Sequence, residues 1–99
     1  MKLWVDDLRP APFVYEWIKS VSLAEYIISL NISLGMSVEL LDLDHDAGDF
    51  AESGGDYIEI LKWMEENHIN NIPIHLHTMN PVGRDNMRLI INRNHWKEV

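Results

Sequence analysis

The sequence contains no cysteine among its 99 residues. This absence excludes a disulfide-stabilised scaffold and a metal site built from thiolates. It also agrees with a reducing setting, and we expect a cytoplasmic protein. The composition, 46% hydrophobic and 24% charged, is that of a folded globular protein. The length predicts one domain that spans residues 1–99.

Basic residues are scarce in this chain. It has 8 Lys and Arg residues against 16 Asp and Glu residues, which gives a formal net charge of -8 at pH 7. Non-specific nucleic-acid binding depends on Lys and Arg side chains that neutralise phosphates, so we expect none. The net negative charge of the chain still allows a phosphate-containing small molecule or one RNA end to bind at a local site.

Long apolar runs and the common phosphate loops are also missing. No segment reaches the roughly 18 apolar residues that a membrane-spanning helix needs, so we expect no membrane partner. Asp6 and Asp7 interrupt the N-terminal apolar stretch too early for a secretory signal. The sequence has no G-x-G-x-x-G, no P-loop and no serine in a nucleophile elbow.

Short apolar runs alternate with amphipathic segments along the chain. Strands are predicted at residues 3–5, 14–19, 38–43 and 74–78, and helices at about residues 22–31, 56–67 and 84–94. The first helix would begin with a capping box of Ser22 and Glu25, and the second with Asp56 as cap. Residues 80–83 are predicted to form a turn. Strands that alternate with helices indicate an α/β domain with a mainly parallel sheet.

The direction of the second strand stays open at this point. Only about seven residues link it to the first strand, whereas a parallel crossover usually takes a dozen or more. A stretched loop that returns along a short strand would still permit the parallel arrangement.

Acidic residues follow two of the predicted strands. Asp6-Asp7 ends the first strand, and Asp44 and Asp46 follow the third. Because ligands of open α/β sheets bind at the carboxyl ends of the strands, these four carboxylates are candidate ligands of Mg²⁺ or another divalent cation. The alternative is that they are only turn and cap residues, since Asp is common after strands.

Two histidines are expected at the same end of the sheet. His45 lies between Asp44 and Asp46, and His77 ends the fourth strand. Histidine titrates near neutral pH, so the two are candidates for a catalytic acid and base. The alternative for each is a structural hydrogen bond.

Further polar residues surround these two groups in the sequence. Arg84, near the predicted start of the last helix, is a candidate catalytic anion-binding group. Its alternative is a solvated surface arginine. The candidate substrate-binding residues are Arg9, Thr78, Asn80 and Asn86.

Three segments carry a family resemblance: MKLWVDDLRPAP, LLDLDHDAGD and IHLHTMNPVGRDNM. In this order they resemble the cyclic-phosphate processing receiver domain, a divergent offshoot of the receiver domains of two-component signalling. The resemblance implies a receiver-like (flavodoxin-like) three-layer sandwich, reduced to about four mainly parallel strands with three helices. Asp6-Asp7 matches the magnesium-binding acidic pair, Asp44 the phosphoacceptor and Thr78 the hydroxyl that ends the fourth strand.

The chain also departs from an ordinary receiver. A fifth strand with its lysine and the first helix are missing, and His45 and His77 are additions. These differences place aspartyl phosphorylation in doubt. The resemblance instead implies processing of a cyclic phosphate, for example the 2′,3′-cyclic phosphate at an RNA or nucleotide end. The alternative is a non-catalytic pseudo-receiver that binds a protein or a nucleotide.

Overall fold

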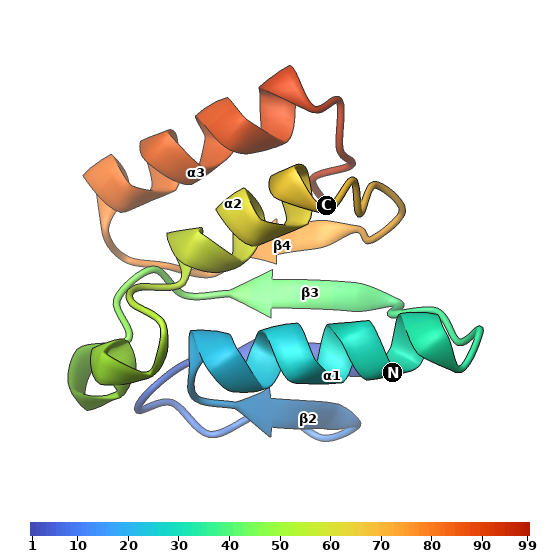
Figure 1. Cartoon of the computed structure of the whole chain (residues 1–99). Coiled ribbons are helices and arrows are strands. Elements are labelled where there is room, and N and C mark those ends of the chain that lie inside the picture. The colour runs from blue at the N-terminus through green and yellow to red at the C-terminus, as the bar shows by residue number, and fades with distance from the viewer.

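The computed structural model describes residues 1–99 as one four-stranded sheet with helices packed on it (Figure 1). Neighbouring strands are parallel in all three pairs, so the second strand is parallel as well. The predicted α/β architecture with four parallel strands and three helices is therefore confirmed. The strands lie in the spatial order β2-β1-β3-β4, with bounds β1 (Lys2–Val5), β2 (Tyr15–Ile18), β3 (Leu40–Leu43) and β4 (Ile74–Leu76).

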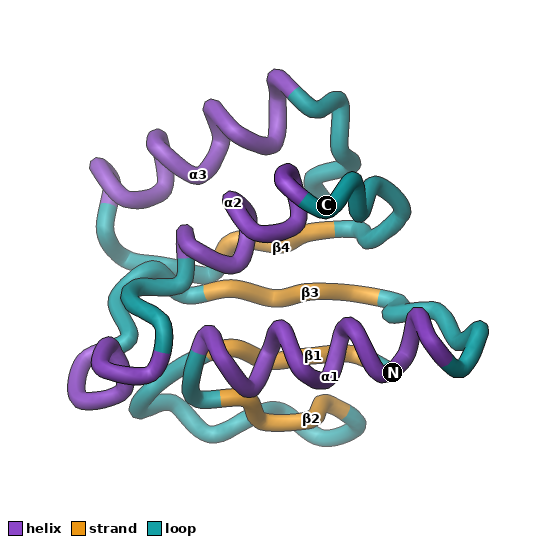
Figure 2. Tube along the Cα trace, in the orientation of Figure 1, coloured by secondary structure: helices purple, strands orange, loops and turns teal.

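The helices form one layer, as the tube in Figure 2 also shows. α2 packs between α1 and α3, and α1 and α2 lie in front of the sheet in Figure 1. None of the helices is long and apolar enough to cross a membrane. Their bounds are α1 (Val21–Ser33), α2 (Ile58–Glu66) and α3 (Pro81–Arg93), and a short 3₁₀ helix, η1 (Gly48–Ser53), follows β3.

The structure has two layers, the sheet and one layer of helices, because no helix covers the second face of the sheet. The reduction of the three-layer sandwich is therefore greater than the sequence indicates. Side chains alternate between the two faces of a strand. Those that point to the helices, such as Leu41 and Leu43, are fully buried. At the alternate positions, Trp4 is half-buried and Trp17 and His75 are exposed. The second face is therefore an aromatic and polar surface rather than a packed core.

The connection between β1 and β2 explains how two parallel strands can be joined without a helix. Each strand is four residues long, about 13 Å, and the nine residues 6–14 can return over that distance in an extended form. The backbone N–H of Asp6 donates to the carbonyl of Ile18 at 3.1 Å, which ties the start of the loop to the end of β2. Val14 ends the loop with a φ of 72°, a strained conformation for a β-branched residue.

The helix starts differ from the predicted ones. Ser20, not Ser22, caps α1, because its hydroxyl accepts from the N–H of Leu23 at 3.1 Å. Asp56 does not cap α2, since its carboxylate accepts from the backbone of Ala47 instead. The predicted turn at residues 80–83 is wrong in part, because α3 already begins at Pro81. Proline fits the first turn of a helix, where its missing N–H would have no partner.

The C-terminal residues occupy the free edge of β4. The N–H of Ile74 donates to the carbonyl of Lys97 at 2.9 Å, and the N–H of Val99 donates to the carbonyl of Ile74 at 2.8 Å. Trp96 is buried and donates to the Asn70 side chain at 3.0 Å. A single parallel bridge therefore stands where a fifth strand would pair.

Candidate functional site

The carboxyl ends of the parallel strands form one edge of the sheet, which we call the rim. Residues that are distant in the sequence meet here because β1, β3 and β4 point in the same direction. Hydrogen bonds divide the rim into two neighbouring clusters. The first contains Asp6, Arg9, Asp44 and His77, and the second contains His45, Asp46, Thr78, Asn80, Gly83 and Arg84.

Asp6 is the centre of the first cluster and is 1% exposed. Its Oδ1 accepts from the backbone N–H groups of Leu8 and Arg9, both at 2.9 Å. Its Oδ2 accepts from Arg9 Nε at 2.8 Å and lies 2.9 Å from His77 Nε2. Burial raises the pKa of Asp6, but the N–H groups of Arg9 and Leu8, with His77 and the Arg9 charge, outweigh it and hold the pKa below its usual value.

Arg9 joins the two carboxylates of the first cluster. Its Nε contacts Asp6, and its terminal nitrogen lies 3.1 Å from Asp44 Oδ2. Burial lowers the pKa of Arg9, but the charges of Asp6 and Asp44 outweigh burial and raise it, so the guanidinium stays charged. The other oxygen of Asp44 accepts from the N–H of His45 at 2.8 Å. The guanidinium thus joins the two residues that directly follow β1 and β3.

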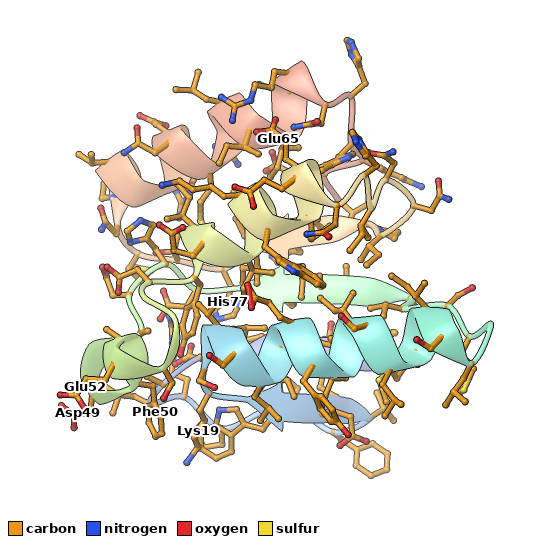
Figure 3. The ribbon with its side chains drawn as sticks, in the orientation of Figure 1. Lys19, Asp49, Phe50, Glu52, Glu65 and His77 are labelled. Atoms are coloured by element: carbon orange, nitrogen blue, oxygen red, sulfur yellow. The ribbon has the colours of Figure 1, made fainter.

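His77 is held on three sides. Its Nδ1 lies 2.6 Å from Asp42 Oδ1, its Nε2 contacts Asp6, and its ring stacks on Trp4 with centroids 3.8 Å apart and planes 3° from parallel. Both ring nitrogens are therefore engaged by carboxylates, one on β3 and one at the end of β1. Figure 3 shows His77 near the middle of the molecule, at the sheet. It is a fixed member of a network, with no free nitrogen.

His45 has a different environment in the second cluster. Its Nδ1 lies 3.0 Å from Asp46 Oδ1, and Nε2 has no partner in the protein. No buried side-chain nitrogen or oxygen lacks a partner, so Nε2 is not fully buried, although the His45 side chain as a whole is only 15% exposed. The ring packs against Gly83 in the first turn of α3, where an added Cβ would lie 2.5 Å from His45 Cγ. His45 can therefore exchange a proton through Nε2 while Asp46 orients the ring.

The remaining candidates organise the start of α3. Asn80 caps the helix through a bond from the N–H of Gly83 at 3.0 Å, and its amide lies 3.4 Å from Asp46 Oδ2. Thr78 is buried, and its hydroxyl accepts from the N–H of Asn80 at 3.1 Å. The Arg84 guanidinium donates to the Thr78 carbonyl. Asn86 is exposed on α3 and takes no part in these bonds.

Asp7 is the carboxylate of the rim that has no basic or hydrogen-bonding side-chain partner. Burial raises its pKa, and the charges of Asp6, Asp44 and Asp46 add to that rise. The same acidic cluster lies near the buried Tyr57, whose hydroxyl donates to the carbonyl of Lys19 at 2.7 Å. Burial, with the charges of Asp7 and Asp6, raises the pKa of the Tyr57 hydroxyl. The rim therefore carries excess negative charge around Asp7.

Two groups of side chains at the rim could hold a metal ion, because their ligand atoms lie within 4.8 Å of one another: Asp6, Asp44 and His77, and also His45, Asp46 and Asp56. The first group does not fit a divalent cation as it is arranged. Three N–H donors and His77 Nε2 already surround the two oxygens of Asp6, and Arg9 takes one oxygen of Asp44. Of the four predicted metal ligands, Asp7 alone keeps a carboxylate without a side-chain partner.

The rim is an open edge, and the pocket of the molecule lies at the other end of the strands. That pocket has a volume of about 370 Å³. Its walls come from the segments that precede β3 and β4, and none of its lining residues is an acid, a lysine or an arginine. Because the acidic and basic side chains gather at the rim, we place the candidate site there.

Sequence reasoning missed three residues of the site: Trp4, Asp42 and Gly83. Asp42 is 5% exposed although it is charged, and it interrupts an otherwise apolar strand. That interruption is a signal that could have been used, because alternation places Asp42 on the opposite face from Leu41 and Leu43. Trp4 and Gly83 carry no comparable signal, since their roles depend on contacts with His77 and His45.

Comparison with known proteins gives one match. The family model of the cyclic-phosphate processing receiver domain matches residues 1–93. No curated protein and no solved structure matches the chain.

Proposed function

This chain belongs to the cyclic-phosphate processing receiver domain family, and we propose that it opens a cyclic phosphate by proton transfer at His45. The substrate class is a phosphate-containing small molecule or RNA end, such as a 2′,3′-cyclic phosphate. The observation that supports this most is the state of His45. One ring nitrogen is oriented by Asp46, the other is free, and the ring lies at the first turn of α3.

The reaction would be hydrolysis by water. His45 Nε2 takes a proton from the water as a new P–O bond forms, and one ring P–O bond breaks. The ribose oxygen that leaves takes a proton from solvent at the open rim. The product is a phosphate monoester and a free hydroxyl, and atoms and charges balance once His45 has returned its proton to solvent. Asp46 keeps the imidazole in orientation and stabilises it when protonated.

The phosphate would bind where the rim offers positive potential. The start of α3 directs the positive end of the helix dipole towards an anion, and the backbone N–H of Val82 in its first turn has no partner in the protein. Asn80 and Arg84 hold this turn in place, through the N–H of Gly83 and the Thr78 carbonyl. Because both nitrogens of His77 are engaged, we assign it a positioning role rather than proton transfer.

The test is hydrolysis of a 2′,3′-cyclic mononucleotide by the purified chain. We expect His45→Gln to lower the rate about 100-fold or more, which is typical for loss of a general base. Asp46→Asn should lower it less, because the ring keeps its basic nitrogen. His68→Asn is the matched control, since His68 lines the pocket at the other end of the strands. No turnover by the wild type, or equal rates in wild type and His45→Gln, would contradict the proposal.

A non-catalytic binding module is the second candidate. The observation that favours it is the second face of the sheet, which no helix covers and on which Trp17 is exposed. A domain of this kind would bind a nucleotide or a protein without changing it. Calorimetry with the same cyclic mononucleotide separates the two functions. Saturable binding without turnover would support the module, and turnover that depends on His45 would exclude it.

A further inference from the structure

The guanidinium of Arg9 lies between Asp6 and Asp44, the two carboxylates that the resemblance to receivers assigns to magnesium binding and phosphorylation. Its Nε is 2.8 Å from Asp6, and its terminal nitrogen is 3.1 Å from Asp44. Both carboxylates are nearly buried, with side-chain exposures of 1% and 12%. Two buried carboxylates this close need a positive charge between them.

We infer that Arg9 is a built-in substitute for the divalent cation, and that it keeps metal away from Asp6 and Asp44. Arg9 thus neutralises the first cluster from within the chain. A cation can reach these two carboxylates only after the guanidinium has moved away. This inference does not depend on the proposed function, because it concerns charge balance at the rim and not a reaction.

The local structure explains why arginine is effective at this position. Asp6 binds the backbone N–H groups of Leu8 and Arg9, so the same carboxylate that needs a cation also folds the loop that delivers it. The planar guanidinium can bond two carboxylates at once, which a lysine ammonium does less well. His77 Nε2 is a fourth close neighbour of Asp6, at 2.9 Å from its Oδ2. No lone pair of Asp6 is left aimed at an open cation position.

The exposure of the Arg9 side chain indicates the side from which a metal ion could reach the cluster. Its side chain is 45% exposed, whereas Asp6 is buried. Loss of the guanidinium would therefore leave two carboxylates accessible from solvent and close enough to share an ion, with His77 beside them. Removal of Arg9 should convert a cluster that excludes metal into one that binds it.

The experiment measures binding of Mn²⁺ alone, by calorimetry and by electron paramagnetic resonance of free Mn²⁺. We expect Arg9→Gln to bind Mn²⁺ at least about tenfold more tightly than the wild type, because a unit charge next to the site is removed. Arg9→Lys keeps the charge and should stay close to the wild type. Arg93→Gln is the matched control, since Arg93 pairs with Glu65 between α2 and α3. Equal or weaker binding by Arg9→Gln would overturn the inference.

A second measurement uses the wild type and does not depend on the folding of a variant. In the nuclear magnetic resonance spectrum, the Nε–H signal of Arg9 reports directly on the contact with Asp6. We expect the chemical shift of this signal to stay unchanged when diamagnetic Mg²⁺ is added. A saturable shift or loss of the Nε–H signal with Mg²⁺ would show that the ion breaks the contact with Asp6 in the presence of Arg9 and would overturn the inference.

Discussion

The Nδ1 atom of His77 lies 2.6 Å from Oδ1 of Asp42, and this contact joins β4 to β3 beside the stacked ring of Trp4. Both side chains are nearly buried, with exposures of 10% and 7%. The contact also orients the imidazole towards Asp6. The uncovered face of the sheet is therefore connected to the rim through His77.

The first prediction concerns the stability of this pair. Removal of one partner of a buried hydrogen bond leaves an unpaired polar group and costs about 1–3 kcal/mol. We expect a loss of this size in the free energy of unfolding of Asp42→Asn, measured by urea denaturation. Replacement of both partners, in Asp42→Leu with His77→Leu, should cost less than the sum of the two single variants.

The matched control for this prediction is an ion pair between two helices. Glu65 lies where α2 meets α3 and pairs with Arg93, a contact that is more exposed (Figure 3). Hydrogen bonds from Arg93 and Asn94 hold the pKa of Glu65 at about 2. Exposed pairs contribute little to stability, so Glu65→Gln should change the urea midpoint only slightly. Equal losses for Asp42→Asn and Glu65→Gln would contradict the assignment of Asp42 to a buried network.

The second prediction is a pH dependence set by Asp7. Burial and the neighbouring carboxylates raise its pKa in the folded protein. A charged Asp7 therefore destabilises the fold at neutral pH, and this penalty disappears as the pH falls through the folded-state pKa. We expect Asp7→Asn to raise the free energy of unfolding at pH 7 and to make little difference below about pH 3, where the acid is protonated in both states.

Asp6 should give the opposite dependence. Its folded-state pKa is lowered, so its stabilising contribution is complete above the unfolded-state pKa and is lost as the pH falls. Urea denaturation at a series of pH values measures both effects. Asp49→Asn, on the exposed η1 helix, is the control for removal of one acidic charge. A loss of stability in Asp7→Asn at pH 7 would show that Asp7 has a stabilising partner.

The third prediction tests the contact between His45 and α3. Alanine usually stabilises the interior of a helix by about 0.5–1 kcal/mol relative to glycine. In Gly83→Ala, however, the new Cβ would lie 2.5 Å from the His45 ring, so the ring must move. We expect no gain in stability, a shift of the His45 signals in the nuclear magnetic resonance spectrum, and a loss of cyclic-phosphate hydrolysis.

The control for this prediction is another alanine substitution in α3. Asn92 is exposed in the same helix, so Asn92→Ala should raise stability slightly and leave the His45 signals unchanged. Unchanged His45 signals in Gly83→Ala would show that the imidazole does not rest on the start of α3.

Much of the fold could be predicted from the sequence because it depends on local patterns. The apolar runs around Leu3, Leu41 and Ile74 mark strands, and the alternation with helices indicates a parallel sheet. Parallel strands carry their carboxyl ends to one edge, so Asp6, Asp44 and His77 were predicted to lie together there. The start of the first helix could not be predicted in this way, because Ser20 and Ser22 are both good caps. In the structure, only the Ser20 hydroxyl accepts from a backbone N–H of the first turn, that of Leu23.

The partners of each side chain could not be predicted in the same way. Asp42 lies beside His75 in the register of β3 and β4, and the residue that reaches its carboxylate is His77, two residues further along the chain and just past the end of β4. Arg9 reaches Asp44 across β1 and β3, although the two residues are far apart in the sequence. The sequence by itself determined that Asp6, Asp44 and His77 gather at the rim, because strands that alternate with helices form a mainly parallel sheet. Only the tertiary structure decided that Arg9 neutralises the acids, that His77 is locked and that His45 is free, because register and packing between distant segments set those contacts.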